Sequence, residues 1–146
     1  MKPPRAVGRL GLALGLALSP LSAFAAPPAI TVYESPACGC CASWVNHLKA
    51  QGFNVTVSMM SDVTPVKDRT GVPVALRSCH TAEVGGYVIE GHVPAQTIKR
   101  LLSERPKAKG LATPGMPPSA PGMDGPYQPY DILIFGGGPQ KVYEKR

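Results

Sequence analysis

Short alternations of apolar and polar residues, separated by one-sided apolar repeats, predict alternating strands and helices from residue 30 onward. Residues 30–34 alternate as Ile-Thr-Val-Tyr-Glu and predict a strand, and residues 53–59 alternate in the same way. Between them, residues 40–51 carry apolar side chains at positions i, i+3, i+4 and i+7, which is the spacing of a helix with one buried face. That face consists of Cys41, Trp44, Val45 and Leu48.

The chain continues with a second and a third set of elements. In order, these are a short helix from Ser61 or Asp62 to Gly71, a loop over residues 72–81, a strand over residues 87–90 entered through Gly85 and Gly86, and a helix from Pro94 to Arg105. The Pro, Gly, Ser and Met content of residues 114–129 predicts an irregular loop, and residues 131–143 predict a hairpin around a Gly-Gly-Gly-Pro turn. The pattern predicts a small α/β sandwich with a mixed sheet.

The first 25 residues have the features of an export signal. Three basic residues precede an unbroken run of Leu, Ala and Gly over residues 10–18, and Ala23-Phe24-Ala25 is a small-x-small cleavage site. An uncleaved membrane anchor is the alternative, but the apolar run is too short to span a bilayer. We therefore expect residues 26–146 to form one exported domain without stable membrane insertion.

Removal of the export signal halves the net positive charge of the chain. The signal holds three of the 15 basic residues and none of the nine acidic ones, so the net charge falls from +6 to +3 on cleavage. The densest basic stretch, residues 99–109, has the pattern of a solvated helix face. Charge and export together argue against nucleic acid as a partner.

Four cysteines carry the candidate chemistry, and three of them lie within four residues. Cys38, Cys40 and Cys41 follow the first predicted strand directly and open the first helix, which is a thioredoxin-like placement. A helix N-terminus favours anions such as thiolates, and clustered soft thiolates select copper(I), zinc or iron–sulfur clusters. Cys79 lies in the loop before the third predicted strand, which in a thioredoxin-like fold passes beside the start of that helix.

Copper(I) fits this cysteine pattern better than zinc does. Structural zinc sites usually show two paired ligand sets, whereas here a triplet is combined with Cys79. Copper(I) tolerates low coordination numbers, and bridging thiolates hold one or more copper ions.

Two other interpretations of the cysteines stay open. Cys38 and Cys41 form a C-x-x-C pair, which suits a thiol–disulfide oxidoreductase; Cys40 is unexplained by that hypothesis because a third thiol would scramble the pair. A purely structural disulfide framework is the other alternative, although bonds within the cluster close almost no loop. Copper binding alone does not make the protein an enzyme, and the sequence leaves open whether it also catalyses a redox reaction of copper or of thiols.

Further soft or borderline ligands accompany the cysteines. His80 adjoins Cys79, and Met116 and Met123 are thioethers in an irregular loop, where a copper-capping role competes with ordinary loop packing. His47 is seven residues beyond Cys40, about 10 Å along a helix, and is expected at the surface. No role is predicted for His92, and Met59 and Met60 are expected in the core.

The combination of motifs resembles a known family. The C-G-C-C cluster, the run from Arg77 to Ala82, the run from Gly85 to Pro94 and the two Pro-Gly-Met turns resemble the family of the periplasmic copper-resistance protein CopG. The resemblance covers residues 30–124. It implies a thioredoxin-like fold, copper bound at Cys38, Cys40, Cys41 and Cys79, a periplasmic location, and a role in copper tolerance alongside other copper-handling proteins.

Overall fold

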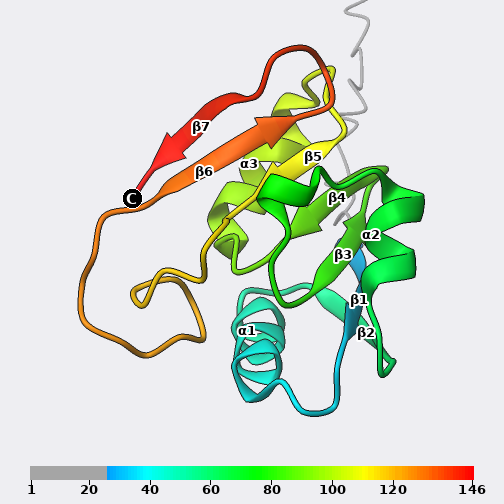
Figure 1. Ribbon diagram of the computed structural model, residues 1–146, viewed down its shortest axis with the longest axis vertical. Coiled ribbons are helices and arrows are strands. Elements are labelled where there is room, and N and C mark those ends of the chain that lie inside the picture. The colour runs from blue at the N-terminus through cyan, green and yellow to red at the C-terminus, as the bar shows by residue number, and fades with distance from the viewer. Residues whose placement is uncertain (1–25) are drawn as a thin grey trace, which may run out of the picture.

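Seven strands form one mixed sheet in the computed structural model, which describes residues 26–146 (Figure 1). The strand order is β2-β1-β3-β4-β5-β6-β7; β1 pairs with β2 and β4 with β5 in parallel, and the other neighbours are antiparallel. The strands are β1 (Ala29–Glu34), β2 (Asn54–Met59), β3 (Thr81–Val84), β4 (Tyr87–Glu90), β5 (Gly110–Ala112), β6 (Asp131–Phe135) and β7 (Lys141–Lys145).

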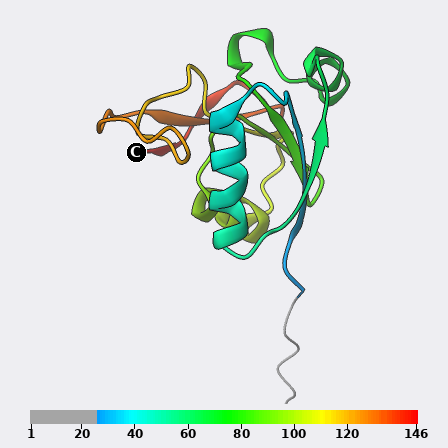
Figure 2. The ribbon, with the colours of Figure 1, turned by 90° about the horizontal axis from the view of Figure 1, so that it is seen from below.

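Helices cover both faces of the sheet. Helices α1 (Gly39–Ala50) and α3 (Ala95–Glu104) lie on one face, and α2 (Thr64–Thr70) lies on the opposite face (Figure 2). A single 3-10 turn, η1 (Val74–Leu76), follows α2. The N-cap position of α2 is Val63, not Ser61 or Asp62 as predicted, although Asp62 Oδ1 accepts the backbone N–H of Thr64, the first residue of the helix, at 2.8 Å.

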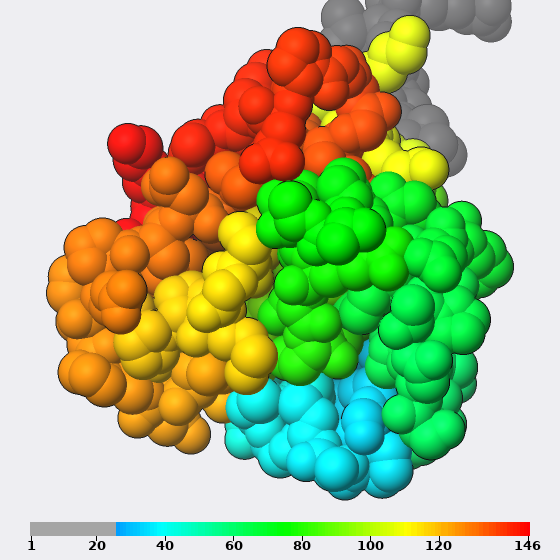
Figure 3. Space-filling view, viewed as in Figure 1, coloured from blue at the N-terminus to red at the C-terminus, as the bar shows by residue number. Residues whose placement is uncertain are grey.

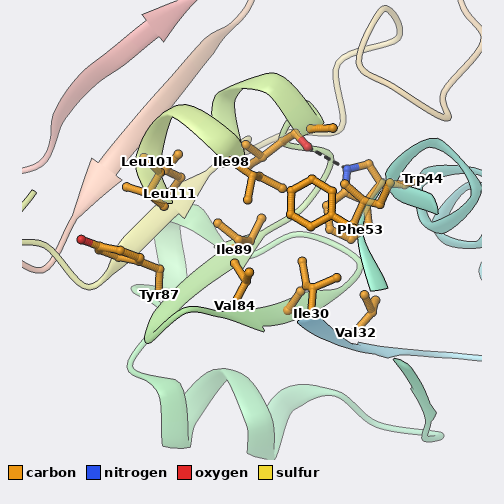
Figure 4. Packing of buried hydrophobic residues seen from close by; sticks show 14 of the residues in the cluster. Ile30, Val32, Trp44, Phe53, Val84, Tyr87, Ile89, Ile98, Leu101 and Leu111 are labelled. Atoms are coloured by element: carbon orange, nitrogen blue, oxygen red, sulfur yellow. Dashed lines mark hydrogen bonds between the residues drawn. The ribbon is translucent and has the colours of Figure 1, made fainter. Parts of the chain in front are cut away.

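The main core lies between the sheet and the two helices α1 and α3 (Figure 4). The predicted stripe of α1 is confirmed: Cys41, Trp44 and Leu48 are fully buried, and Val45 is nearly so. Trp44 also donates its indole N–H to the carbonyl of Val93 at 2.9 Å, which satisfies its polar atom inside the core. Each Leu or Ile buried here stabilises the fold by about 1.5–3 kcal/mol.

Two strands were missing from the sequence prediction. Thr81–Val84, assigned in part to a loop, forms β3, and Gly85 and Gly86 form its hairpin turn to β4. Both glycines have positive φ, 56° and 87°, as a two-residue hairpin turn of this kind requires. Gly110–Ala112 forms the buried strand β5. Both strands are too short and too uniformly buried for alternation to reveal them.

The mixed α/β architecture, the irregular loop and the C-terminal hairpin are confirmed. The narrower thioredoxin-like assignment stays a prediction. The predicted export signal, residues 1–25, lies outside the described residues. Within residues 26–146, no helix combines the length and apolar character needed to cross a bilayer.

Candidate metal centre

Segments that are distant in sequence meet at one end of the sheet. Strand β1 runs toward this end and leads into the cysteine cluster, while β3 starts there directly after Cys79 and His80. Register fixes the arrangement, because Tyr33 pairs with Thr81 and Thr81 pairs with Glu90. The residues just outside β1, β3 and β4 are therefore neighbours in space.

All four cysteines meet at this end, as the sequence predicts. Their Sγ atoms lie within 4.8 Å of one another. A disulfide joins Cys38 and Cys41, and Cys40 Sγ lies 3.5 Å from Cys38 Sγ. Within residues 26–146, Cys40 and Cys79 are free thiols. Cys41 is fully buried and the other three are half-buried, so the cluster is reachable from solvent.

The start of α1 gives this cluster a favourable electrostatic environment for anions. Cys38 occupies the N-cap position, and its own N–H is held by the carbonyl of Ser35 at 3.0 Å. The N–H groups of the first helical turn have no partner within a helix and point toward its N-terminal end. A negatively charged group is favoured at this position, and α1 has no acidic residue in its first turn to oppose it.

A buried ion pair holds the segment that carries Cys79. Glu90 is fully buried, and its Oε1 accepts the Lys67 ammonium at 2.6 Å and the backbone N–H of Ser78 at 2.6 Å. Its Oε2 accepts the Thr81 hydroxyl at 2.7 Å, and Lys67 also donates to that hydroxyl at 3.0 Å. The network connects α2, β3 and β4 and fixes the residues on both sides of the pair Cys79-His80.

Two histidines complete the surroundings of Cys79. Cys79 Sγ lies 3.4 Å from His80 Nδ1 and 3.4 Å from His92 Nε2, and the three side chains form a second group that is compact enough for a metal. Burial lowers the pKa of His80 to about 3 and lowers the pKa of His92, so both rings are neutral at pH 7. Burial also raises the pKa of the Cys79 thiol.

The Pro- and Met-rich loop is anchored beside this group. The carbonyl of Pro121 accepts His92 Nδ1–H at 2.7 Å, and Gly122 packs so tightly against the backbone of Trp44 that a Cβ there would lie 2.6 Å from its nitrogen. Figure 3 shows this loop, in yellow and orange, packed against the segments that carry α1 and the Cys79 loop. Met116 is 38% exposed and Met123 is half-buried, so neither fills a core.

Two sequence expectations about single residues need correction, and one histidine without a predicted role lies at the site. His47 is half-buried rather than at the surface, because its Nε2 accepts the N–H of Ala95 at 3.2 Å. Met59 was expected in the core but is 58% exposed at the end of an edge strand. His92 was given no role, yet it contacts Cys79. The Gly85-Gly86 hairpin signal could have revealed this contact, because pairing Thr81 with Glu90 brings Cys79 opposite His92.

Comparisons with known proteins identify similar chains. A family model described as a protein of unknown function, DUF411, matches residues 76–123. No curated protein matches the chain. Two solved structures, both of the copper resistance protein copG, are similar to it. Form 2 has a TM-score of 0.78 and form 1 a TM-score of 0.76; each is 41% identical, and each match covers 82% of this chain and 98% of the other.

Proposed function

Since this chain belongs to the family of the copper resistance protein CopG, we propose that it binds copper(I) and contributes to copper handling outside the cytoplasm. The proposed ligands are the thiolates of Cys38, Cys40, Cys41 and Cys79. One observation carries this proposal: the four sulfur atoms come from two distant segments and lie within 4.8 Å of one another. Such a cluster brings soft ligands to one point, and three of its cysteines are partly exposed to solvent.

The copper-binding state requires the Cys38–Cys41 disulfide to be open. Two electrons and two protons, supplied by an external dithiol reductant, convert the disulfide into two thiols. Each thiol then loses its proton when it binds the metal. Four soft thiolates at a helix N-terminus favour copper(I) over harder ions, and bridging sulfurs accommodate one or more ions.

His80, Met116 and Met123 are further proposed ligands. His80 is supported by its 3.4 Å separation from Cys79 Sγ. The two methionines are supported by their loop, whose Pro121 and Gly122 contact His92 and Trp44 beside the cysteines. Thioether sulfur is a soft ligand, so the loop is suited to cap copper(I) on the solvent side.

Competition between metals tests the proposal. Protein reduced anaerobically is titrated with copper(I) in the presence of a chromophoric copper(I) chelator, and separately with zinc against a zinc chelator. We expect tighter binding of copper(I) than of zinc and protection of all four thiols from alkylation by bound copper. Tighter binding of zinc, or four thiols that stay fully reactive in the presence of copper(I), would contradict it.

A thiol–disulfide oxidoreductase is the second candidate function, and the Cys38–Cys41 disulfide is the observation that favours it. In that function the Cys38 thiolate attacks a substrate disulfide, and Cys41 resolves the mixed disulfide, which leaves the observed bond and a reduced substrate. Reductase assays with a model disulfide substrate separate this activity from copper binding.

We also propose that residues 1–25 are removed on export and that residues 26–146 act in the periplasm, with copper ions and other copper-handling proteins as partners. The basic start, the apolar run and the Ala-Phe-Ala site support cleavage after Ala25. Intact-mass analysis of protein expressed in a Gram-negative host should find a chain that begins at Ala26. Recovery of the complete chain from the cytoplasm would contradict it.

A further inference from the structure

The Gly-Gly-Gly-Pro turn of the C-terminal hairpin borders a hollow that the proposed copper site does not use. The hollow has a volume of about 400 Å³ and lies between this turn and the segment that joins α3 to β5. It is at the end of the sheet where β1 starts and β6 ends, whereas the cysteines lie at the opposite end (Figure 1). A volume of this size is typical of ligand sites in proteins.

The hollow combines apolar surface with positive charge. Ala108, Ile134 and Phe135 contribute apolar surface, together with two prolines. Among residues 26–146, the charged side chains that line it are those of Lys107 and Lys141, and both residues are exposed. An apolar surface with a few charged groups beside it is the usual composition of a binding site.

Close backbone packing holds the two sides of the hollow in place. Lys109 donates its backbone N–H to the carbonyl of Phe135 at 2.8 Å. A Cβ at Gly137 would collide with the carbonyl oxygen of Lys107, and a Cβ at Gly136 would collide with the side chain of Lys109. The consecutive glycines therefore let the turn approach this segment closely, and a preformed site of this kind lowers the cost of binding.

The lysines at this end of the sheet have no acidic partners. Within residues 26–146, no ion pair involves Lys107, Lys109 or Lys141. None of the nine acidic residues of the chain lines the hollow, and Glu104, the nearest in sequence, is bound to Arg100 and Tyr143. A complementary ligand therefore carries negative charge beside an apolar group.

We propose that this hollow binds an acidic segment of a partner protein. One apolar side chain of that segment enters the hollow, and carboxylates on either side of it pair with Lys107 and Lys141. A membrane surface also offers negative charge, but a flat array of headgroups does not fill a concave apolar site. The inference goes beyond copper binding, because a partner held at this end leaves the cysteines at the opposite end accessible.

Fluorescence anisotropy on the reduced apo-protein, residues 26–146, tests this site. The probe is a fluorescein-labelled peptide, Asp-Glu-Phe-Glu-Asp, and two comparison peptides replace its phenylalanine with serine or its acidic residues with lysine. The double variant Lys107→Glu with Lys141→Glu reverses both charges at the hollow. Lys49→Glu with Lys145→Glu is the matched control, since these lysines are also exposed, lie outside the hollow and change the net charge equally. Circular dichroism checks that both variants are folded.

We expect the wild type and the control variant to bind the acidic peptide, and the Lys107→Glu, Lys141→Glu variant to bind it at least about tenfold more weakly. Loss of the phenylalanine should weaken binding to the wild type by about tenfold, because the hollow then stays unfilled, and the lysine peptide should not bind. Copper(I) affinity should be the same in all three proteins.

Equal binding by the two double variants would overturn the inference, as would equal binding of the peptides with and without phenylalanine. The peptide comparison uses the wild type and so does not depend on the folding of any variant. Attachment to phosphatidylglycerol vesicles without binding of the acidic peptide would overturn it in favour of a membrane surface. Since the peptide is titrated into apo-protein, a failure of the copper proposal would leave this result unchanged.

Discussion

Replacing Glu90 with Gln should destabilise the protein far more than its small change in shape suggests. Glu90 is fully buried and is the only carboxylate bonded to the Lys67 ammonium within residues 26–146. Glu90→Gln removes the negative charge and leaves a buried lysine without a counter-charge. Breaking a buried pair from one side costs about 3–5 kcal/mol. Because Gln keeps one acceptor oxygen for Ser78 or Thr81, we expect a loss near the lower figure, about 3 kcal/mol.

The assay is urea unfolding of the reduced apo-protein, residues 26–146, with Glu83→Gln as the matched control. Glu83 is on the neighbouring strand and pairs with Arg69, but both side chains are substantially exposed, at 37% and 56%. An exposed pair of this kind contributes at most about 1 kcal/mol. The double variant Lys67→Met with Glu90→Gln removes both charges and should recover part of the lost stability.

The same variant should weaken copper binding, because the Ser78 N–H bond to Glu90 fixes the segment that carries Cys79. We expect reduced copper(I) affinity in Glu90→Gln and wild-type affinity in Glu83→Gln. A loss of stability below about 1 kcal/mol, equal to that of the control, would refute the reasoning. It would mean that the buried pair contributes no more than a surface pair.

Three further predictions concern the loop and the histidines. Gly122→Ala should lower the free energy of unfolding by about 1–3 kcal/mol, because the new Cβ would lie 2.6 Å from the backbone nitrogen of Trp44. Gly115→Ala is the control, since Gly115 has a similar φ but open space around it, and should cost less. Equal losses in the two variants would contradict this prediction. Replacing Met116 and Met123 together with Leu should lower copper(I) affinity about tenfold and leave zinc affinity unchanged, and unchanged copper(I) affinity would exclude a capping role. The stability of the apo-protein should fall as pH drops below about 6.5. Burial lowers the pKa of His47, His80 and His92 in the folded protein, so these histidines take up protons when the protein unfolds. Each of them can lower the free energy of unfolding by up to about 1.4 kcal/mol per pH unit. Glu34, whose pKa is raised by burial, opposes this trend, and stability that is flat between pH 7.5 and 5 would contradict the prediction.

Periodicity predicted those elements whose pattern is long enough to express one buried face. The α1 stripe of Cys41, Trp44, Val45 and Leu48 extends over about two helical turns, which is enough to identify one buried face. Thr81–Val84 and Gly110–Ala112 were missed because they are only four and three residues long and depend on neighbouring strands for their hydrogen bonds. Local pattern carries no information about such partners.

In the candidate site, too, the residues close together in sequence were predicted, and those brought together by distant segments were harder to predict. The triplet near Cys38 is visible in the sequence because its members are adjacent, and Cys79 was placed beside it from topology. His92 was missed because a single histidine after a strand has no spacing signal of its own. Its contact with Cys79 arises from the register of β3 and β4 and from a loop 29 residues away, where Pro121 fixes the ring.

The most direct test of the account is copper bound per chain, and copper(I) affinity, in the wild type and in Cys40→Ser under reducing conditions. Cys40 is a third thiolate ligand in the copper centre but takes no part in a Cys38–Cys41 dithiol. Serine is similar in volume, and its hard hydroxyl is a poor copper(I) ligand. We expect Cys40→Ser, and likewise Cys79→Ser, to reduce the copper bound per chain or lower copper(I) affinity by at least about tenfold, roughly 1.4 kcal/mol, with little change in apo-protein stability. Normal copper binding by Cys40→Ser, together with loss of disulfide-reductase activity in Cys38→Ser and Cys41→Ser, would contradict the copper centre and favour the oxidoreductase.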